Sequence, residues 1–359
     1  AYRKSQKITQ IFYYRSLNIK DDGYLTVKLN HIRLTLLYRT KTMTVLVDAA
    51  IARKELKGSN MEMTYAGVTS FMRRNYTKDL NGVDIAISGI PFDLAVTYRS
   101  GARLGPRAIR EASVQLAELL PYPWGFDPFD RLAVIDYGDC FLDPHNPMTI
   151  RDSIKEHITN IINQDVFPLT FGGDHYITYP ILLAMAEKHG KGISLIHFDA
   201  HCDTWPDDEE YSLNHGTMFY KAIKNGIVDP AKSVQIGIRT WNDDFMGTNI
   251  LDAQYVHDHG AKKVVERIRE IVGDNLVYLT FDIDSLDPAF APGTGTPVPG
   301  GLSSAQALAI VRNLDGLNLI GADVVEVSPS YDHAEITALA AAHVACDVIC
   351  LLAQQKSRD

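Results

Sequence analysis

From about residue 80 to the end of the chain, short apolar runs alternate with longer segments in which apolar residues recur every three or four positions. Several of the short runs are apolar almost throughout, which is typical of strands covered on both faces of a sheet. The predicted strands span residues 84–90, 132–136, 166–171, 193–198, 233–238, 276–281 and 319–327. This alternation of strands and helices predicts an α/β fold with a parallel sheet and right-handed crossovers.

Four of the longer segments carry helical signals. The first has an isoleucine on each turn, and the second alternates charged residues with Val and Ile. The third follows Ser303, a residue type that caps helices, and the fourth is rich in alanine and is expected to be a buried closing helix. In chain order these helices are predicted over residues 150–161, 261–272, 303–312 and 336–352.

The composition is that of a globular, water-soluble protein, with 46% hydrophobic and 22% charged residues in 359. No apolar run approaches the roughly 20 residues needed to span a bilayer, so we expect no membrane association. The four cysteines show neither CxxC spacing nor the density of a disulfide scaffold, which favours a reducing, cytoplasmic location. The net charge of −9 argues against a nucleic-acid partner.

Charge is unevenly distributed along the chain. Residues 1–60 carry 12 Lys/Arg and 4 Asp/Glu, a balance of +8, which leaves 23 against 40, or −17, for the remainder. We therefore predict a basic N-terminal extension over residues 1–60 and a single catalytic domain over residues 61–359. The extension lacks the amphipathic period and apolar core of targeting peptides, so an appended arm or a mis-assigned start is the preferred interpretation.

Candidate metal ligands follow three of the predicted strands, where open α/β sheets bind ligands. In an extended segment alternate residues share a face, so Asp199, His201 and Asp203 should point one way, and Asp282 and Asp284 likewise. Cys202 falls on the opposite face and is interpreted as a packing residue. The candidate ligands are His175, Asp199, His201, Asp203, Asp282 and Asp284.

Each motif alone has a simpler interpretation, since an Asp-x-Asp pair after a strand is often a turn and Asp174 could cap the next helix. Together, four converging carboxylates would repel one another unless cations neutralised them or their pKa values rose. Two bridged divalent ions are the simplest solution. Four Asp and two His without a thiolate favour Mn²⁺ over Zn²⁺, with Co²⁺ or Fe²⁺ as substitutes. Such sites turn bound water into a nucleophile.

Two further residues narrow the reaction. His215, within Asn-His-Gly, could be a packing residue or, beside a metal site, a proton shuttle, because an unperturbed histidine has a pKa of about 6.5. Glu326 interrupts an apolar strand, and a buried carboxylate needs a partner. A cationic substrate or a structural arginine could supply that partner.

These motifs resemble the ureohydrolase family of arginases and agmatinases. The matching stretches include Phe-Gly-Gly-Asp-His, Phe-Asp-Ala-His-Cys-Asp, Phe-Asp-Ile-Asp-Ser-Leu-Asp-Pro and Ala-Pro-Gly-Thr-Gly-Thr-Pro, at 171–175, 198–203, 281–288 and 291–297. The similarity extends from about residue 62 to the end, and is greatest to bacterial agmatinases over 122–126, 215–220 and 335–340.

The resemblance implies a three-layer α/β/α fold of the arginase/deacetylase type, with a mostly parallel eight-stranded sheet, and a homo-oligomer (a trimer or hexamer). It also implies two Mn²⁺ per subunit. In that arrangement Asp199 and Asp282 bridge the ions. His175 and Asp203 complete one site, and His201 and Asp284 complete the other.

The resemblance further implies that activated water attacks the carbon of a small cationic guanidino substrate, releasing urea and an amine. Asp203 would orient the water, His215 would pass a proton to the amine, and Glu326 would pair with the guanidinium. A run of four acids at 207–210 departs from the arginase pattern, and as an acidic rim it would favour agmatine, giving putrescine for polyamine biosynthesis. If these four acids are instead a solvated surface run, they say nothing about the substrate.

Other functions stay open at this point. Arg99 and Arg103 could accept a carboxylate, as a guanidinobutyrase or another guanidino-acid hydrolase requires, or could make structural contacts. A two-metal phosphohydrolase would need cationic groups near the metals, and the ligand loops offer none. The chain could also be a non-catalytic metal-binding protein, and a turnover assay would distinguish this alternative from an enzyme.

Overall fold

The computed structural model describes residues 18–19, 24–29, 32–37, 48–58 and 63–356, and divides the chain into two compact units, Ala1–Val47 and Asp48–Asp359. In the first unit, β1 (Asn18–Ile19), β2 (Tyr24–Leu29) and β3 (Ile32–Leu37) form an antiparallel sheet. The predicted domain boundary, after residue 60, lies C-terminal to this division. Residues 48–58, including α1 (Ala49–Ala52), belong to the second unit.

The described part of the second unit contains one nine-stranded parallel sheet, in the order β10-β9-β8-β11-β12-β7-β5-β6-β4. The seven predicted strands are all present, as β5 (Ile85–Ile90), β6 (Val134–Asp139), β7 (Phe167–Gly172), β8 (Ser194–Phe198), β9 (Val234–Ile236), β11 (Leu276–Asp282) and β12 (Asn318–Val325). The expected count of eight is wrong by one. The unpredicted edge strands β4 (Asn75–Tyr76) and β10 (Asn249–Leu251) are too short to produce a hydrophobic period.

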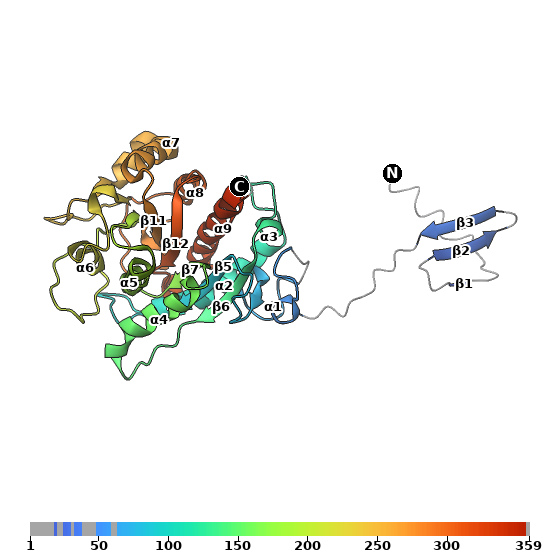
Figure 1. The fold of residues 1–359 in the computed structure, drawn as a ribbon. Coiled ribbons are helices and arrows are strands. Elements are labelled where there is room, and N and C mark those ends of the chain that lie inside the picture. The colour runs from blue at the N-terminus through green and yellow to red at the C-terminus, as the bar shows by residue number, and fades with distance from the viewer. Residues whose placement is uncertain (1–17, 20–23, 30–31, 38–47, 59–62, 357–359) are drawn as a thin grey trace. The chain divides into compact units, whose positions relative to one another are not determined.

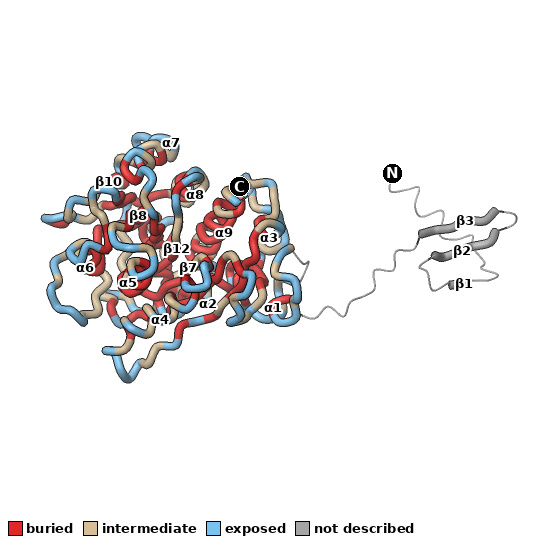
Figure 2. The backbone as a smooth tube through the Cα atoms, in the orientation of Figure 1, coloured by how far each residue is buried: buried red, intermediate tan, exposed pale blue. Residues whose placement is uncertain are grey.

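Helices cover both faces of this sheet, which gives the predicted three layers (Figure 1). One core cluster joins the sheet to α2 (Gly105–Ser113), α7 (Ala253–Val272), α8 (Ser304–Arg312) and α9 (Ile336–Lys356). The other joins it to α4 (Ile150–Ile162), α5 (Thr178–His189) and α6 (Met218–Lys224). The central strands are therefore buried on both faces (Figure 2). Burying each large apolar side chain stabilises the fold by about 1.5–3 kcal/mol.

The helices follow from the patterns that predicted them. Helix α4 buries its isoleucine stripe, and Ser303 forms a capping box with Gln306 at the start of α8. Helix α7 begins earlier than predicted, and Gly260 (φ 70°) breaks it just before the predicted segment. Among the described residues, only α9 is long and apolar enough to cross a membrane. Its most apolar window has a mean hydropathy of 2.1 and is 72% buried within the fold, as a core helix should be.

The smaller elements connect these layers. In chain order they are η1 (Phe71–Arg73), η2 (Ala102–Leu104), η3 (Val114–Ala117), α3 (Pro128–Arg131), η4 (Pro147–Thr149), η5 (His175–Ile177), η6 (Pro230–Lys232), η7 (Ile283–Ser285) and η8 (Pro329–Tyr331). The four strands that precede the candidate site residues are adjacent, in the order β8-β11-β12-β7. Because they are parallel, their carboxyl ends meet at one edge of the sheet and bring the loops that follow them together.

Candidate metal centre and active site

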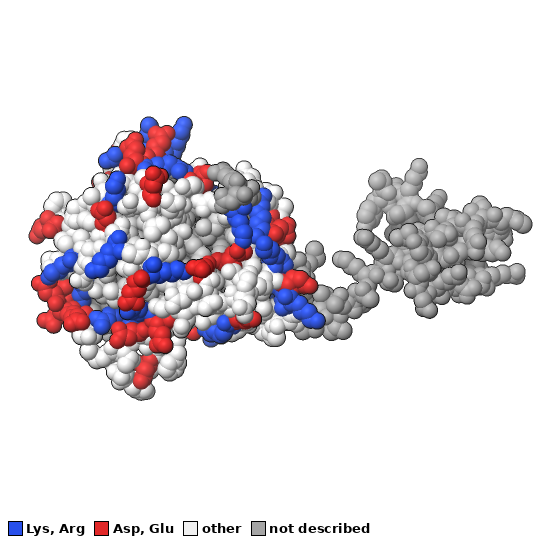
Figure 3. Space-filling model, viewed as in Figure 1, with Lys and Arg blue, Asp and Glu red and all other residues white. Residues whose placement is uncertain are grey.

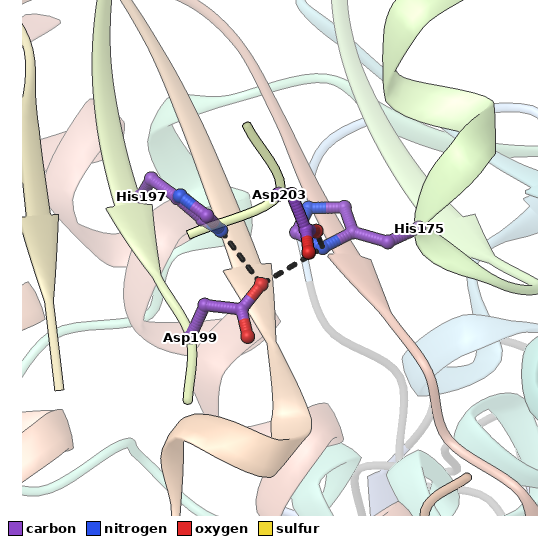
Figure 4. A group of neighbouring side chains, drawn as sticks. All are labelled: His175, His197, Asp199 and Asp203. Carbon is purple, nitrogen blue, oxygen red and sulfur yellow. Dashed lines mark hydrogen bonds and ion pairs between the residues drawn. The ribbon is translucent and has the colours of Figure 1, made fainter. Parts of the chain in front are cut away.

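Three loops place carboxylates around one imidazole nitrogen. Nδ1 of His175 lies 3.1 Å from Oδ2 of Asp199, 3.1 Å from Oδ2 of Asp203 and 3.2 Å from Oδ2 of Asp282. All four side chains are buried. Figure 4 shows three of them, with His197 on the other side of Asp199. The structure therefore brings together residues that follow β7, β8 and β11.

A second group shares Asp199 with the first. Nδ1 of His201 lies 3.3 Å from Oδ1 of Asp199 and 3.1 Å from Oδ2 of Asp284. Asp199 thus presents one oxygen to each histidine, the arrangement that a bridging carboxylate requires. All six residues predicted as ligands lie in these two groups.

The backbone of these loops is not extended throughout, so strict alternation does not by itself explain how their side chains converge. Asp203 has φ 54°, a left-handed conformation that is uncommon and strained for a residue other than glycine. Asp282 accepts a hydrogen bond from the N–H of Asp284 and begins the short helix η7. Cys202 is buried, and its sulfur contacts Thr204 and Asn242 rather than the carboxylates.

Hydrogen bonding behind His175 shows that this centre fits a cation. Thr280 donates its hydroxyl hydrogen to Oδ1 of Asp323 (2.6 Å), so it must accept from Nε2–H of His175 (2.8 Å). In the neutral ring, the form in which an imidazole binds a metal, Nδ1 then carries a lone pair, and this buried atom has no hydrogen-bond partner. A lone pair that faces three carboxylate oxygens is repulsive unless a positive ion lies between them. Imidazole and carboxylate donors are common ligands for divalent metals.

The electrostatics of the bare protein point the same way. Burial and the charges of Asp284 and Asp199 raise the pKa of Asp282 well above its usual range. Burial and the charge of Asp199 also raise the pKa of Asp203. Burial alone would lower the pKa of His201, but the charge of Asp284 and the hydrogen bond with Asp199 raise it to about 12. These shifts describe an excess of buried negative charge, which divalent ions would neutralise.

Beside this centre, the partly buried His215 pairs with the buried Glu326. Nδ1 of His215 lies 2.9 Å from Oε1 of Glu326, and Nε2 accepts from the N–H of Thr97 at 3.2 Å. The hydroxyl oxygen of Thr97 lies 3.0 Å from the same nitrogen. Burial alone would lower the pKa of His215, but hydrogen bonding and charge interaction with Glu326 raise it to about 9. Glu326 therefore stabilises the charged form of His215, whose second proton would sit on Nε2 in place of the hydrogen bond that this nitrogen accepts from Thr97.

Glu326 is held in place by its backbone and by two donors. It follows β12 with φ 63°, and its Oε1 also accepts the N–H of His175 at 2.9 Å. No arginine in the described part of the chain pairs with it. Its Oε2 is buried without a hydrogen-bond partner, and Glu326 is not among the residues that line the adjoining cavity. A Cβ on Gly295 would lie 3.4 Å from this oxygen, so glycine keeps the space beside it open.

A cavity of about 290 Å³ opens over the two groups. Its lining consists of candidate ligands, His215 and mostly neutral residues: Thr97, His201, Asp203, Trp205, Asn214, His215, Gly216, Thr217, Asp282 and Thr296. Among the residues that the structure describes, no lysine or arginine lines it. Arg99 lies over the rings of Tyr98 and Tyr331, and Arg103 pairs with Asp93.

The four acids at 207–210 do not line this cavity, so the structure gives no support to the acidic-rim interpretation. Asp207 lies 3.2 Å from Nζ of Lys221, and Asp208 pairs with Lys224. Glu210 lies 3.7 Å from Arg151. Figure 3 likewise shows acidic and basic side chains interspersed on the face in view. Three of the four acids thus pair with basic residues on helices α4 and α6.

The sequence reasoning missed three residues that the structure places at the site. Thr97 contacts His215, Trp205 lines the cavity, and His197 bonds Asp199 through Nε2 at 2.7 Å. His197 could have been found by the signal that identified Glu326, an ionisable residue within a buried apolar strand. Thr97 and Trp205 lie in loops, whose placement depends on tertiary packing.

Known proteins are similar to this chain in sequence and in fold. The model of the Arginase family matches residues 83–351. An agmatinase of Chromobacterium violaceum is 67% identical over 309 residues, which cover 86% of this chain and 96% of that one. The crystal structure of a hypothetical agmatinase from Burkholderia thailandensis has 69% identity and a TM-score of 0.86, covering 86% of this chain and 98% of that chain. Proclavaminate amidino hydrolase from Streptomyces clavuligerus has 37% identity and a TM-score of 0.77, covering 82% of this chain and all (100%) of that chain.

Proposed function

Because the chain belongs to the arginase family, we propose that it is a metal-dependent amidinohydrolase that converts agmatine and water into putrescine and urea. The observation that carries this proposal is the unpartnered Nδ1 of His175 facing the carboxylates of Asp199, Asp203 and Asp282. High identity to proteins named agmatinases supports agmatine as the substrate.

The two groups would hold two Mn²⁺, with Co²⁺ or Fe²⁺ as substitutes, since the donors are carboxylates and imidazoles without a thiolate. His175, Asp199, Asp203 and Asp282 would hold one ion, and Asp199, His201 and Asp284 would hold the other. When bound, such a pair supplies positive charge and a water molecule that ionises near neutral pH.

The protein's own residues would orient the substrate and move protons. Oε2 of Glu326, left free in the structure, would accept a hydrogen bond from the guanidinium. Asp203, which lines the cavity, would orient the attacking water and accept its proton. A new carbon–oxygen bond forms, the carbon–nitrogen bond to the amine breaks, and His215 would deliver a proton to that nitrogen. Glu326 stabilises the charged form of His215, as a general acid near neutral pH requires.

The residues that line the cavity, rather than the acids at 207–210, support a substrate with a cationic tail. Agmatine carries a second positive charge, and the indole of Trp205 can bind an ammonium over its face. A carboxylate tail, as in arginine or 4-guanidinobutyrate, would meet no lysine or arginine among the described residues of the lining. The fully buried Glu326 would also repel phosphate, which disfavours a phosphohydrolase.

We also propose a cytoplasmic homo-oligomer, a trimer or hexamer, as the resemblance implies. Light scattering coupled to gel filtration measures the mass directly.

A substrate panel tests the proposed reaction. The protein is chelated, reloaded with Mn²⁺ and assayed for urea from agmatine, arginine and 4-guanidinobutyrate, with putrescine measured as the second product. We expect agmatine to have by far the highest kcat/KM. Faster release from 4-guanidinobutyrate would replace agmatinase activity with guanidino-acid hydrolysis, and no urea from any substrate would overturn the enzymatic proposal.

A further inference from the structure

A buried histidine outside the six candidate ligands contacts the carboxylate that the two groups share. His197 lies on β8, two positions before Asp199, and its side chain is 0% exposed. Its Nε2 lies 2.7 Å from Oδ2 of Asp199, the same oxygen that lies 3.1 Å from Nδ1 of His175. Figure 4 shows Asp199 between the two imidazoles. His197 thus contacts the same oxygen of Asp199 that faces His175.

The neighbouring strand determines which nitrogen of His197 carries hydrogen. Gln235 lies opposite His197 in the β8–β9 ladder, and its Nε2 approaches Nδ1 of His197 at 3.2 Å. The same amide nitrogen donates to the carbonyl oxygen of Cys202 at 2.8 Å. That carbonyl fixes the amide orientation, because a rotated amide would place oxygen against oxygen. Nδ1 of His197 is therefore the acceptor, and Nε2–H is the donor to Asp199.

Packing holds the ring in this orientation. The ring of Phe219 lies edge-on to His197, at 4.6 Å between centroids, and to His175, at 5.4 Å. The two imidazoles are themselves 5.2 Å apart and tilted by 67°. With Gln235 on one side and Phe219 on another, His197 presents a fixed hydrogen-bond donor.

We propose that His197 is a positioning residue for the metal centre. Its Nε2–H fixes the carboxylate of Asp199 so that one oxygen faces each metal position, and Gln235 keeps the hydrogen on Nε2. The inference rests on the two-metal centre proposed above. It adds to that centre a residue that binds no ion itself, since both ring nitrogens are already engaged. Partners of this kind commonly change metal affinity by about 10–100-fold when removed.

The test is Mn²⁺ binding by the chelated full-length protein, measured by calorimetry and by the electron paramagnetic resonance signal of coupled ions. His197→Phe removes the donor but keeps a ring, and we expect about 10–100-fold weaker binding and loss of the coupled signal. His197→Gln restores an N–H and should recover most of the affinity. Gln235→Leu frees the ring to place its hydrogen on either nitrogen and should weaken binding to a smaller extent.

His157→Phe is the matched control, because His157 is another largely buried histidine, hydrogen-bonded to Ser88 at 2.6 Å, that contacts none of the candidate ligands. It should bind Mn²⁺ as the wild-type protein does. Wild-type affinity and an unchanged coupled signal in His197→Phe would overturn the inference. If that variant does not fold, wild-type affinity in Gln235→Leu would overturn it instead. Wild-type protein that binds no Mn²⁺ would overturn the metal centre itself, a separate and distinguishable failure.

Discussion

Oε1 of Glu326 lies 2.9 Å from Nδ1 of His215, and the two side chains are 1% and 11% exposed. The carboxylate outweighs the effect of burial and raises the pKa of His215 to about 9. This single contact couples the residue proposed to bind the guanidinium to the residue proposed to protonate the leaving amine.

Glu326→Gln should therefore move the pH dependence of turnover. In the wild type, the proton on His215 is lost as pH rises through about 9, and activity that needs this proton is lost with it. Gln removes the charge that raises the pKa, so the alkaline limb of kcat should shift to lower pH. Mn²⁺-loaded protein is assayed from roughly pH 6 to 10. If the alkaline limb of kcat in Glu326→Gln stays at the wild-type pH, Glu326 does not control the protonation of His215, even if the absolute rate falls.

Asp284→Ala should remove one metal equivalent, because Asp284 belongs only to the group around His201. Losing one ion removes several kcal/mol of charge stabilisation, or a factor of roughly 1000 or more in kcat. Metal content is measured by mass spectrometry after gel filtration. Asp243→Ala changes an exposed acid that bonds Trp241 and should retain both ions. Unchanged metal content in Asp284→Ala would contradict the ligand assignment.

Trp205→Leu should weaken the binding of a cationic tail. An ammonium over an indole is worth about 0.5–2 kcal/mol, so KM for agmatine should rise roughly 2–30-fold with kcat less affected. Asp208→Asn is the control, since Asp208 pairs with Lys224 outside the cavity and should leave KM unchanged. A larger effect in the Asp208 variant would restore the acidic-rim interpretation.

His157 should make the protein sensitive to mild acid. Burial, followed by the charge of Lys78, lowers its pKa to about 4, below the unfolded value of 6.5. The unfolded chain then binds the extra proton first as pH falls, so the stabilisation is complete above pH 6.5 and is lost between 6.5 and about 4. The loss is on the order of 3 kcal/mol. His157→Gln should flatten this part of the stability curve, measured by urea unfolding, and an unchanged slope would contradict the prediction.

Local sequence patterns predicted much of the fold correctly. The central strands are buried on both faces, so they could be predicted from apolar runs in the sequence. The Ser303 cap and the isoleucine stripe of α4 could also be predicted, because they depend only on neighbouring residues. The convergence of His175, Asp199 and Asp282 followed from a rule about parallel sheets. What failed depended on tertiary structure. The left-handed backbone of Asp203 and the pairing of Asp208 with Lys224 are not visible in hydrophobic periodicity.

The adjacency of β7, β8, β11 and β12 has a consequence for how the chain folds. Glu326 and His175 are 151 positions apart, yet they share a hydrogen bond just beyond the carboxyl ends of the neighbouring strands β12 and β7. Contacts of such long range cost loop-closure entropy and are therefore slow to form. The ions can then bind tightly only to a completed sheet, and binding free energy of this kind adds to the stability of the whole unit. Metal depletion should therefore lower the midpoint of global unfolding, and retention of ions should report that the central strands are correctly assembled.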